Sequence, residues 1–419
     1  MSASQQSLAI IVPEMLPVPP VQGGAVEHWV HEVSKRLDKT KFCVSIFSRP
    51  ANARSVEGVK YVGIPWTSLE KFCHRLKERS NRKNPLRYLA KIQNVTSYGL
   101  RVAREARGFD SIVIHNEPNL VLFLRKKPAQ KIILHMHNEH LSMWLFRPFY
   151  RCALKKVDQV ICVSEYIRLA AIEHFPEYAD KFSTIFNATD TQVFKPYGDE
   201  GIKALHGLVD IEKNKTYLLY AGRLTDPKGV HVLIEAFKRV HQHKPCTRLI
   251  IAGSSFFGGA ARTKYEQYLE VLAKPVSSAI LFTGYLPHEK LKYLYSSVDI
   301  VLIPSIWQDP CPLVVLEAMA AARCVIASAV GGIPEVLLHQ INGILVPPND
   351  VEAIAKAITH VIKNPKLRLD MGNTAREKTL LRYDWSRLVQ EIESSFLPPI
   401  NHSQLTKMHV DIKKIEVTH

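Results

Sequence analysis

The sequence lacks the segments that mark membrane-spanning, secreted and dinucleotide-binding proteins. No apolar run reaches the length of about 20 residues that a membrane-spanning helix needs. Residues 1–7 are polar, with no basic segment followed by an apolar one, so we expect no secretory signal and a cytoplasmic location. No G-x-G-x-x-G fingerprint is present, which disfavours a bound dinucleotide cofactor.

Cysteine and metal-binding patterns are equally sparse. The seven cysteines are odd in number and none forms a C-x-x-C pair, which predicts reduced and buried thiols. The chain has no D-x-D pair and no H-E-x-x-H motif. We therefore expect no cofactor and no metal site.

Positive charge is abundant and unevenly spread. The formal net charge is +16, and residues 69–107 contain eleven Lys or Arg against three Asp or Glu. A solvated helix face would explain this stretch, as would a surface that meets anionic lipid of the inner membrane or an anionic acceptor. No nucleic-acid motif accompanies the charge, so we expect no specific nucleic acid partner.

Length and apolar patterning predict two α/β domains. A chain of 419 residues is too long for one ordinary core and suits two domains of about 200 residues each. Short apolar runs alternate with helical patterns in two successive blocks, as in doubly wound parallel sheets. We predict Rossmann-like domains at 1–195 and 196–382, a last helix at 383–400 and a polar tail at 401–419.

The segment 303–322 is the richest in candidate binding residues. A strand ends before a loop that holds Asp309, and a helix then begins near Pro312 and Leu313. Free backbone N–H groups at that helix start can hold a phosphate. We expect Asp309 at the lip of a crevice and Glu317 inside it, where both could bind sugar hydroxyls. A helix cap and a buried glutamate would explain this spacing equally well.

Turns with glycine follow two predicted strands. The segment A-G-R-L-T-D-P-K-G at 221–229 places Arg223 and Lys228 beside a glycine turn. A guanidinium and an ammonium group suit a diphosphate, although an ordinary surface turn would look the same. Gly23 and Gly24 come after the first strand, where glycine lets a ligand approach the backbone.

Three histidines lie within the six residues 135–140, at the end of a predicted strand. Their density could suggest a metal, but no other metal motif supports that interpretation. A His137 that contacts a sugar or handles a proton is the better hypothesis. We expect His135 and His140 to be packed side chains with satisfied hydrogen bonds.

In their order and spacing, these motifs resemble family 4 of the retaining glycosyltransferases, which have the GT-B fold. The resemblance covers nearly the whole chain. It rests on the glycine pair at 23–24, H-M-H-N at 135–138, V-S-E-Y at 163–166, N-A-T-D-T-Q-V-F-K-P at 187–196, A-G-R-L…K-G at 221–229, D-P-C-P-L-V-V-L-E-A-M-A at 309–320, G-G-I-P-E at 331–335 and N-G-I-L-V at 342–346.

The resemblance implies two doubly wound domains that face each other across a cleft, with a nucleotide sugar on the C-terminal domain. Glu317 would bind the ribose and Asp309 the hydroxyls of the donor sugar. Arg223 and Lys228 would neutralise the diphosphate without a metal ion. Asp309 replaces the family's usual glutamate, which changes the hydroxyl that the side chain can reach.

The N-terminal domain would face the acceptor. By the same resemblance, Gly24 would approach the phosphates or the sugar, and His137 would contact the donor sugar near its reacting carbon. The acceptor would attack on the face of the leaving group, so no nucleophilic carboxylate is required. The helix at 384–396 would cross back to the N-terminal domain.

The segments 18–29, 113–116 and 134–138 more closely resemble lipopolysaccharide-core N-acetylglucosaminyltransferases of bacteria, and also spore-coat members of the family. That similarity implies UDP-N-acetylglucosamine or another UDP-hexose as donor. It implies an anionic, lipid-linked saccharide as acceptor, in the synthesis of bacterial surface polysaccharide. A GDP- or ADP-sugar donor, a sugar-nucleotide epimerase and an inactive binding or coat protein remain alternatives.

Overall fold

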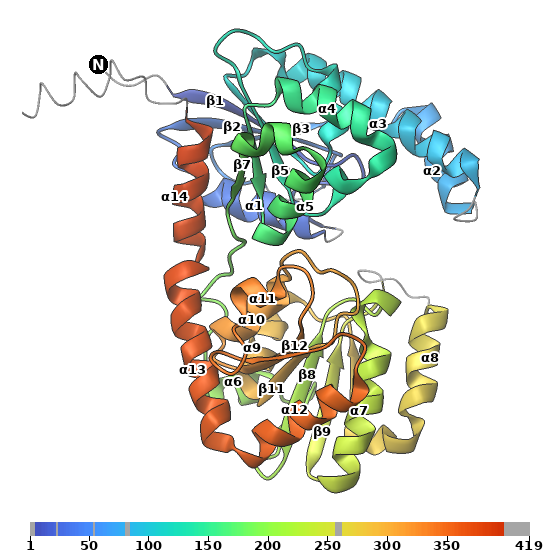
Figure 1. Cartoon of the computed structure of the whole chain (residues 1–419), viewed down its shortest axis with the longest axis vertical. Helices are drawn as coiled ribbons and strands as arrows, with labels where there is room; N and C mark the ends of the chain where they lie inside the picture. The colour runs from blue at the N-terminus through green and yellow to red at the C-terminus, as the bar shows by residue number, and fades with distance from the viewer. Residues whose placement is uncertain (1–4, 22–23, 53–54, 80–83, 256–261, 398–419) are drawn as a thin grey trace, which may run out of the picture.

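The computed structural model describes residues 5–21, 24–52, 55–79, 84–255 and 262–397. Its strands form two separate sheets, one in each half of the chain, and all the strand pairings are parallel. Figure 1 shows the N-terminal domain above the C-terminal domain, with the last two long helices along one side. In the part of the chain that the structure describes, no helix is long and apolar enough to cross a membrane.

The N-terminal sheet has seven strands in the order β3-β2-β1-β4-β5-β6-β7. Leu8 of β1 belongs to the core on one face with Trp29, and Ala9 belongs to the core on the other face with Tyr98. Both faces are covered, so these strands are continuously apolar. The strands are β1 (Gln6–Ile11), β2 (Phe42–Ser48), β3 (Val59–Gly63), β4 (Ser111–His115), β5 (Lys131–Met136), β6 (Gln159–Cys162) and β7 (Phe182–Thr184).

The C-terminal sheet has six strands in the order β10-β9-β8-β11-β12-β13. Leu302 of β11 packs in the core that contains Phe237, whereas Val301 packs on the opposite face in the core that contains Leu316. This sheet is therefore also a middle layer between two layers of helices. Its strands are β8 (Thr216–Ala221), β9 (Thr247–Ala252), β10 (Ile280–Gly284), β11 (Ile300–Ile303), β12 (Cys324–Ser328) and β13 (Ile344–Val346).

The α-helices connect these strands and cover both sheets. In the N-terminal half they are α1 (Ala25–Arg36), α2 (Ser68–Arg79), α3 (Pro85–Glu105), α4 (Arg147–Lys156) and α5 (Glu165–His174). In the C-terminal half they are α6 (Asp199–Ala204), α7 (Val230–His243), α8 (Lys264–Ala273), α9 (His288–Ser297), α10 (Leu313–Ala320), α11 (Ile333–Val336), α12 (Val351–Lys363), α13 (Pro365–Arg382) and α14 (Trp385–Phe396).

Helix α14 packs on the N-terminal domain although it ends the described chain (Figure 1). Leu388 and Phe396 lie in the same core as Leu8 of β1. Lys131 Nζ at the start of β5 donates a hydrogen bond to the carbonyl oxygen of Ser395 at 2.6 Å. The domain limits remain predictions, and both the tail at 401–419 and Gly23 lie outside the described residues.

The structure adds two strands that the sequence did not predict and corrects one expectation. The short edge strands β7 and β13 were not predicted, because three residues are too few to show a period in the sequence. The expectation that the cysteines are buried is wrong for Cys43, Cys152 and Cys246, which are exposed. Cys152 lies on α4 and Cys246 in the turn before β9, where a side chain can point to solvent.

Candidate functional site

The candidate residues follow strands at the points where the strand order reverses. In the C-terminal sheet this point lies between β8 and β11, and the loops that follow them carry Arg223, Lys228 and Asp309. In the N-terminal sheet it lies between β1 and β4, which lead to Gly24 and His115. Ligands of doubly wound sheets bind at such switch points, outside the carboxyl ends of the strands.

Lys228 and Asp309 form an ion pair in the C-terminal domain. The Lys228 Nζ contacts the Asp309 Oδ2, and Ser305 Oγ lies 3.4 Å from the same oxygen. Asp309 is only 5% exposed, so the expectation that it stands at the lip of a crevice is wrong. The carboxylate can be buried because a cation and a hydroxyl group satisfy it. Nζ also lies 5.5 Å from the ring centroid of Trp307.

Glycines fix the backbone around this ion pair. Gly229 has a φ of +70°, and a Cβ there would lie 1.9 Å from the Pro304 carbonyl oxygen. Gly331 has a φ of +54°, and its Cβ would lie 2.1 Å from the carbonyl oxygen of Asp309. The N–H of Gly332 donates to that same oxygen at 2.9 Å. These contacts explain Gly229 and Gly331 as requirements for close backbone packing.

Glu317 lies in the second turn of α10 and is 5% exposed, and its place inside a crevice stays a prediction. Burial raises the pKa of Glu317 above its ordinary value, while the charge of His288 and the hydroxyl of Tyr295 partly lower it. Tyr295 is itself fully buried. A carboxyl group held in this way suits hydrogen bonds to neutral hydroxyl groups of a ligand.

An anion site is available where α10 begins. Pro312 occupies the N-cap position, Leu313 is the first helical residue, and no side chain caps the helix. The unbonded N–H groups of a first helical turn attract phosphate. Arg223, on the loop after β8, has an exposed side chain, while its carbonyl oxygen accepts the Tyr220 hydroxyl at 2.7 Å. This exposure lets its guanidinium reach a ligand.

Gly24 precedes α1 with a φ of 104°. A Cβ at this position would lie 2.1 Å from Oε2 of Glu27, which is the end of a flexible side chain, so the positive φ is what favours glycine here. Glu27 is 4% exposed, and burial raises its pKa to about 7. The sequence reasoning missed Glu27, because a glutamate in a first helical turn is an ordinary pattern.

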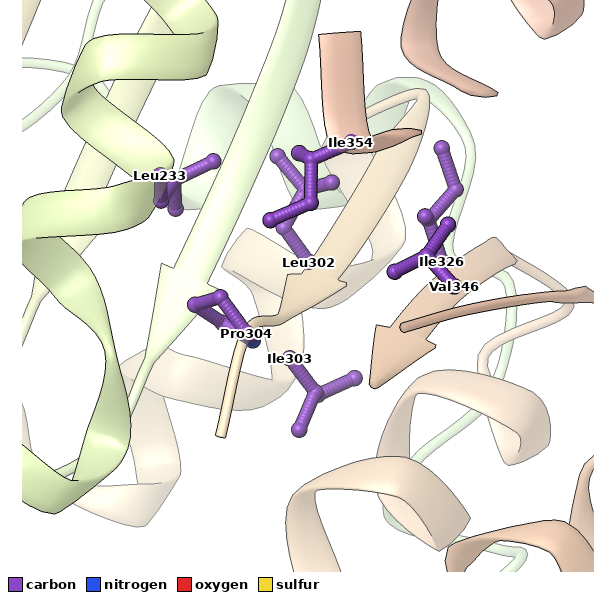
Figure 2. A pocket seen from close by; sticks show the side chains of 7 residues that line it. All are labelled: Leu233, Leu302, Ile303, Pro304, Ile326, Val346 and Ile354. Carbon is purple, nitrogen blue, oxygen red and sulfur yellow. The ribbon is translucent and has the colours of Figure 1, made fainter. Parts of the chain in front are cut away.

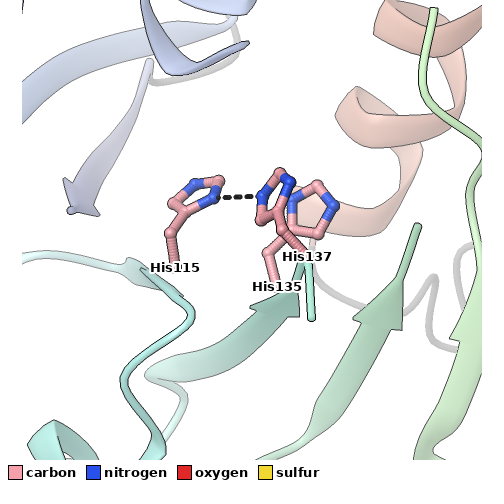
Figure 3. A group of neighbouring side chains, drawn as sticks. All are labelled: His115, His135 and His137. Carbon is pink, nitrogen blue, oxygen red and sulfur yellow. Dashed lines mark hydrogen bonds between the residues drawn. The ribbon is translucent and has the colours of Figure 1, made fainter. Parts of the chain in front are cut away.

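Figure 3 shows His115, His135 and His137 gathered at the ends of β4 and β5. His115 Nδ1 lies 3.0 Å from His137 Nε2, and the rings of His135 and His137 have centroids 4.3 Å apart. Burial lowers the pKa of His137 to about 3, so its imidazole is neutral at physiological pH. His140 is hydrogen-bonded as expected, with Nδ1 2.8 Å from the Asn116 carbonyl oxygen.

The expectation that His135 is a satisfied side chain is wrong. Neither of its ring nitrogens has a hydrogen-bond partner among the described residues, and Nε2 of His115 also lacks one. Both side chains are at most 1% exposed. Unpartnered polar atoms at such depth are rare in folded proteins.

The two domains contact each other directly through hydrogen bonds. The Glu335 carboxylate of α11 accepts hydrogen bonds from the backbone N–H groups of Glu165 and Tyr166, both at 2.7 Å. Asn187 Nδ2 donates to the carbonyl oxygen of Cys311 at 3.3 Å. The motif at 331–335 therefore fixes the C-terminal domain to the first turn of α5.

A small apolar hollow near the carboxyl end of β11, shown in Figure 2, is not a ligand site. It has no room for a water molecule, and apolar side chains line it. It is part of the core beneath the binding loops. The lining residues are Leu233, Leu302, Ile303, Pro304, Ile326, Val346 and Ile354.

Four further residues of the site escaped the sequence reasoning. Tyr295 lies beside Glu317, Ser305 and Trp307 lie beside the Lys228–Asp309 pair, and Glu27 lies beneath Gly24. Ser305 and Trp307 fall inside the segment 303–322, so only their roles were missed. Tyr295 lies on α9, and no motif around it in the sequence indicates a binding role.

Two family models match the chain, one in each half. Residues 23–193 match the model described as Glycosyltransferase Family 4, and residues 203–378 match the one described as Glycosyl transferases group 1. These matches agree with the resemblance found in the motifs.

Full-length relatives show the same relationship. The chain is 30% identical over 410 residues to the putative glycosyltransferase YtcC of Bacillus subtilis, covering 94% of this chain and 93% of the relative. It is 26% identical over 396 residues to the lipopolysaccharide 1,2-N-acetylglucosaminetransferase of Salmonella typhimurium, covering 93% and 97%. Alr3699/HepE of Anabaena, solved in complex with UDP, superposes with a TM-score of 0.71 at 19% identity, covering 93% and 99%. The chain therefore belongs to the group 1 and family 4 glycosyltransferases, and it has their two-domain GT-B fold.

Proposed function

We propose that the protein is a retaining hexosyltransferase that uses a UDP-sugar, with UDP-N-acetylglucosamine as the first candidate. The observation that carries the proposal is the group formed by Glu317, the Lys228–Asp309 pair and the uncapped start of α10, all at the switch point of the C-terminal sheet. The Salmonella relative is named for N-acetylglucosamine transfer and the Anabaena structure contains UDP, which supports this donor class.

The C-terminal domain would hold the donor. Glu317 would bind the ribose hydroxyls, and Asp309, paired with Lys228, would bind a hydroxyl of the sugar. Arg223, Lys228 and the backbone N–H groups at Leu313 would face the diphosphate. These donors would stabilise the negative charge that grows on the leaving group, which is a contribution that a metal ion makes in other sites.

The N-terminal domain would supply His137 and the acceptor side. A neutral imidazole can accept or donate a hydrogen bond near the reacting carbon without adding charge there. The acceptor hydroxyl would attack on the face that the diphosphate leaves, and the departing phosphate oxygen would take its proton. Gly24 would leave room for the donor beside α1.

The donor proposal is tested by binding of UDP-, GDP- and ADP-sugars, with EDTA present. We expect wild type to bind one UDP-sugar and Glu317→Ala to bind it at least ten-fold more weakly, because the ribose hydroxyls lose their acceptor. The matched control is Glu352→Ala, an exposed glutamate on α12, which should bind like wild type. If wild type binds no nucleotide sugar, the proposed function is wrong; if it binds a GDP- or ADP-sugar instead, only the donor class changes.

We propose an anionic, lipid-linked saccharide at a membrane surface as the acceptor, with contact through 69–107. On α2 and α3, Phe72 and Leu89 are 62% and 61% exposed, and the exposed Lys71, Arg75 and Lys91 lie on the same helices. Apolar side chains among basic ones suit an anionic bilayer. A hollow of about 420 Å³ lies between the helices, lined by Cys73, Leu76, Leu86, Leu89, Ala90, Ile92, Gln93 and Thr96.

Sedimentation with lipid vesicles tests this contact. We expect binding to phosphatidylglycerol vesicles, weaker binding to phosphatidylcholine vesicles, and loss of binding as salt rises. Phe72→Ser should weaken it, whereas Leu381→Ser, which changes an even more exposed apolar residue on α13, should not. Equal binding of both lipids, or none, would contradict the proposed contact.

A further inference from the structure

We propose that His115, His135 and His137 bind one divalent transition-metal ion, zinc in the first place, and that the bound ion stops sugar transfer. One ring nitrogen from each histidine lies within 4.8 Å of the others. The binding of the ion stands on this geometry alone. Its effect on transfer rests on the proposed function.

The backbone of the sheet places the three rings together. β4 and β5 pair in parallel with His115 opposite His135. His137 follows His135 by two residues, and residues at i and i+2 of an extended chain point to the same side. Strand register therefore holds His115 beside His135, and His137 follows one residue after β5 ends, with its ring centroid 4.3 Å from that of His135.

The cluster offers buried ring nitrogens to a ligand. Both ring nitrogens of His135 and Nε2 of His115 lack hydrogen-bond partners in the described part of the chain, and both residues are at most 1% exposed. Buried polar atoms normally have a partner. A cation bound by one nitrogen of each ring would give His135 a partner and would replace the contact between His115 Nδ1 and His137 Nε2.

The chemistry of the three ligands favours a zinc-like ion. Neutral imidazole suits zinc, copper and nickel, whereas magnesium and calcium prefer oxygen ligands. Zn–N bonds measure about 2.0–2.1 Å, so nitrogens that share one tetrahedral ion lie roughly 3.3 Å apart, which requires those of this cluster, within 4.8 Å of one another, to move only slightly. His115 Nδ1 and His137 Nε2 are already 3.0 Å apart. Trp29 packs against the rings, with its centroid 4.5 Å from that of His135, and so supports their orientation.

Three nitrogens leave a fourth position of the metal open, as in catalytic zinc sites. His137 is the partly exposed member of the three, so the ion can enter and take a water molecule from that side. The coordinated nitrogen of His137 then has no lone pair to offer the donor sugar. Bound metal would in this way remove His137 from transfer and return it when a chelator extracts the ion.

Metal binding is measured on the full chain after EDTA treatment and blocking of exposed thiols with iodoacetamide. We expect saturable binding of one Zn²⁺ by calorimetry, and visible absorption bands of a nitrogen-bound site with Co²⁺. His135→Phe keeps an aromatic ring but offers no ligand, and should bind at least ten-fold more weakly. His231→Phe is the matched control, because His231 lies on α7 with Nδ1 2.9 Å from the Tyr265 hydroxyl.

His115→Phe gives a second removal of a ligand if His135→Phe does not fold, as judged by circular dichroism. Absence of saturable zinc binding to wild type, or equal affinity in wild type and the folded ligand variants, would overturn the site. Transfer is then assayed with zinc and with zinc plus EDTA, relative to the rate of each variant. Zinc that binds at the cluster without slowing transfer would overturn the inhibitory role. If no sugar is transferred under any condition, the proposed function fails while the titration still decides the site.

Discussion

Replacing Lys228 by methionine removes the cation that faces the Asp309 carboxylate. Their side chains are 19% and 7% exposed, so the carboxylate would remain buried without a countercharge. Removing one partner of a buried ion pair destabilises a protein by about 3–5 kcal/mol. Because Lys228 is partly open to water, we expect the lower end, about 3 kcal/mol.

The double variant Lys228→Met/Asp309→Asn measures the pair itself. With no carboxylate left to bury, it should lose only about 1–2 kcal/mol, which is less than Lys228→Met loses alone, so the two single losses will not add. Lys238→Met is the control: its Nζ contacts Glu235 at 2.9 Å in a more exposed pair, and it should change stability by at most about 0.5 kcal/mol.

Urea unfolding followed by circular dichroism gives these free energies. Additive single losses would refute the argument.

Two other changes test the interdomain contact and the buried glutamate. Glu335→Ala removes two charge-assisted hydrogen bonds to the first turn of α5, so we expect the free energy of unfolding in urea to fall by about 2 kcal/mol. The control Glu173→Ala changes an exposed glutamate of α5 and should have little effect. Equal losses in the two variants would show that the interdomain contact adds nothing. Burial raises the pKa of Glu27 from 4.5 to about 7, so its ionisation destabilises the folded state as pH rises through that window. Glu27→Gln should therefore gain stability over wild type between pH 5 and pH 8, by up to about 3 kcal/mol, and a gain equal at both pH values would contradict this.

Much of the fold follows from local patterns. The run at 111–115 is apolar enough to be assigned as a strand, and the prolines before Leu313 mark where a helix begins. The sequence could predict that Glu317 faces inward. It lies among apolar residues of one helix, where a carboxylate turns toward the core or a ligand. The strands β7 and β13 were missed because three residues carry too weak a pattern.

The sequence by itself determined the two α/β blocks, the order of their elements and the motifs of the family, because periodicity and turn chemistry act between neighbours in the chain. Only the tertiary structure decided that Asp309 is buried against Lys228, that Glu335 binds the first turn of α5, and that His115 joins His135 and His137. Those partners are 81, 170 and 22 residues apart in their hydrogen-bonded pairs. Sheet order and strand register bring residues that are so far apart in the sequence close together in space. Neither is encoded in any single stretch of residues.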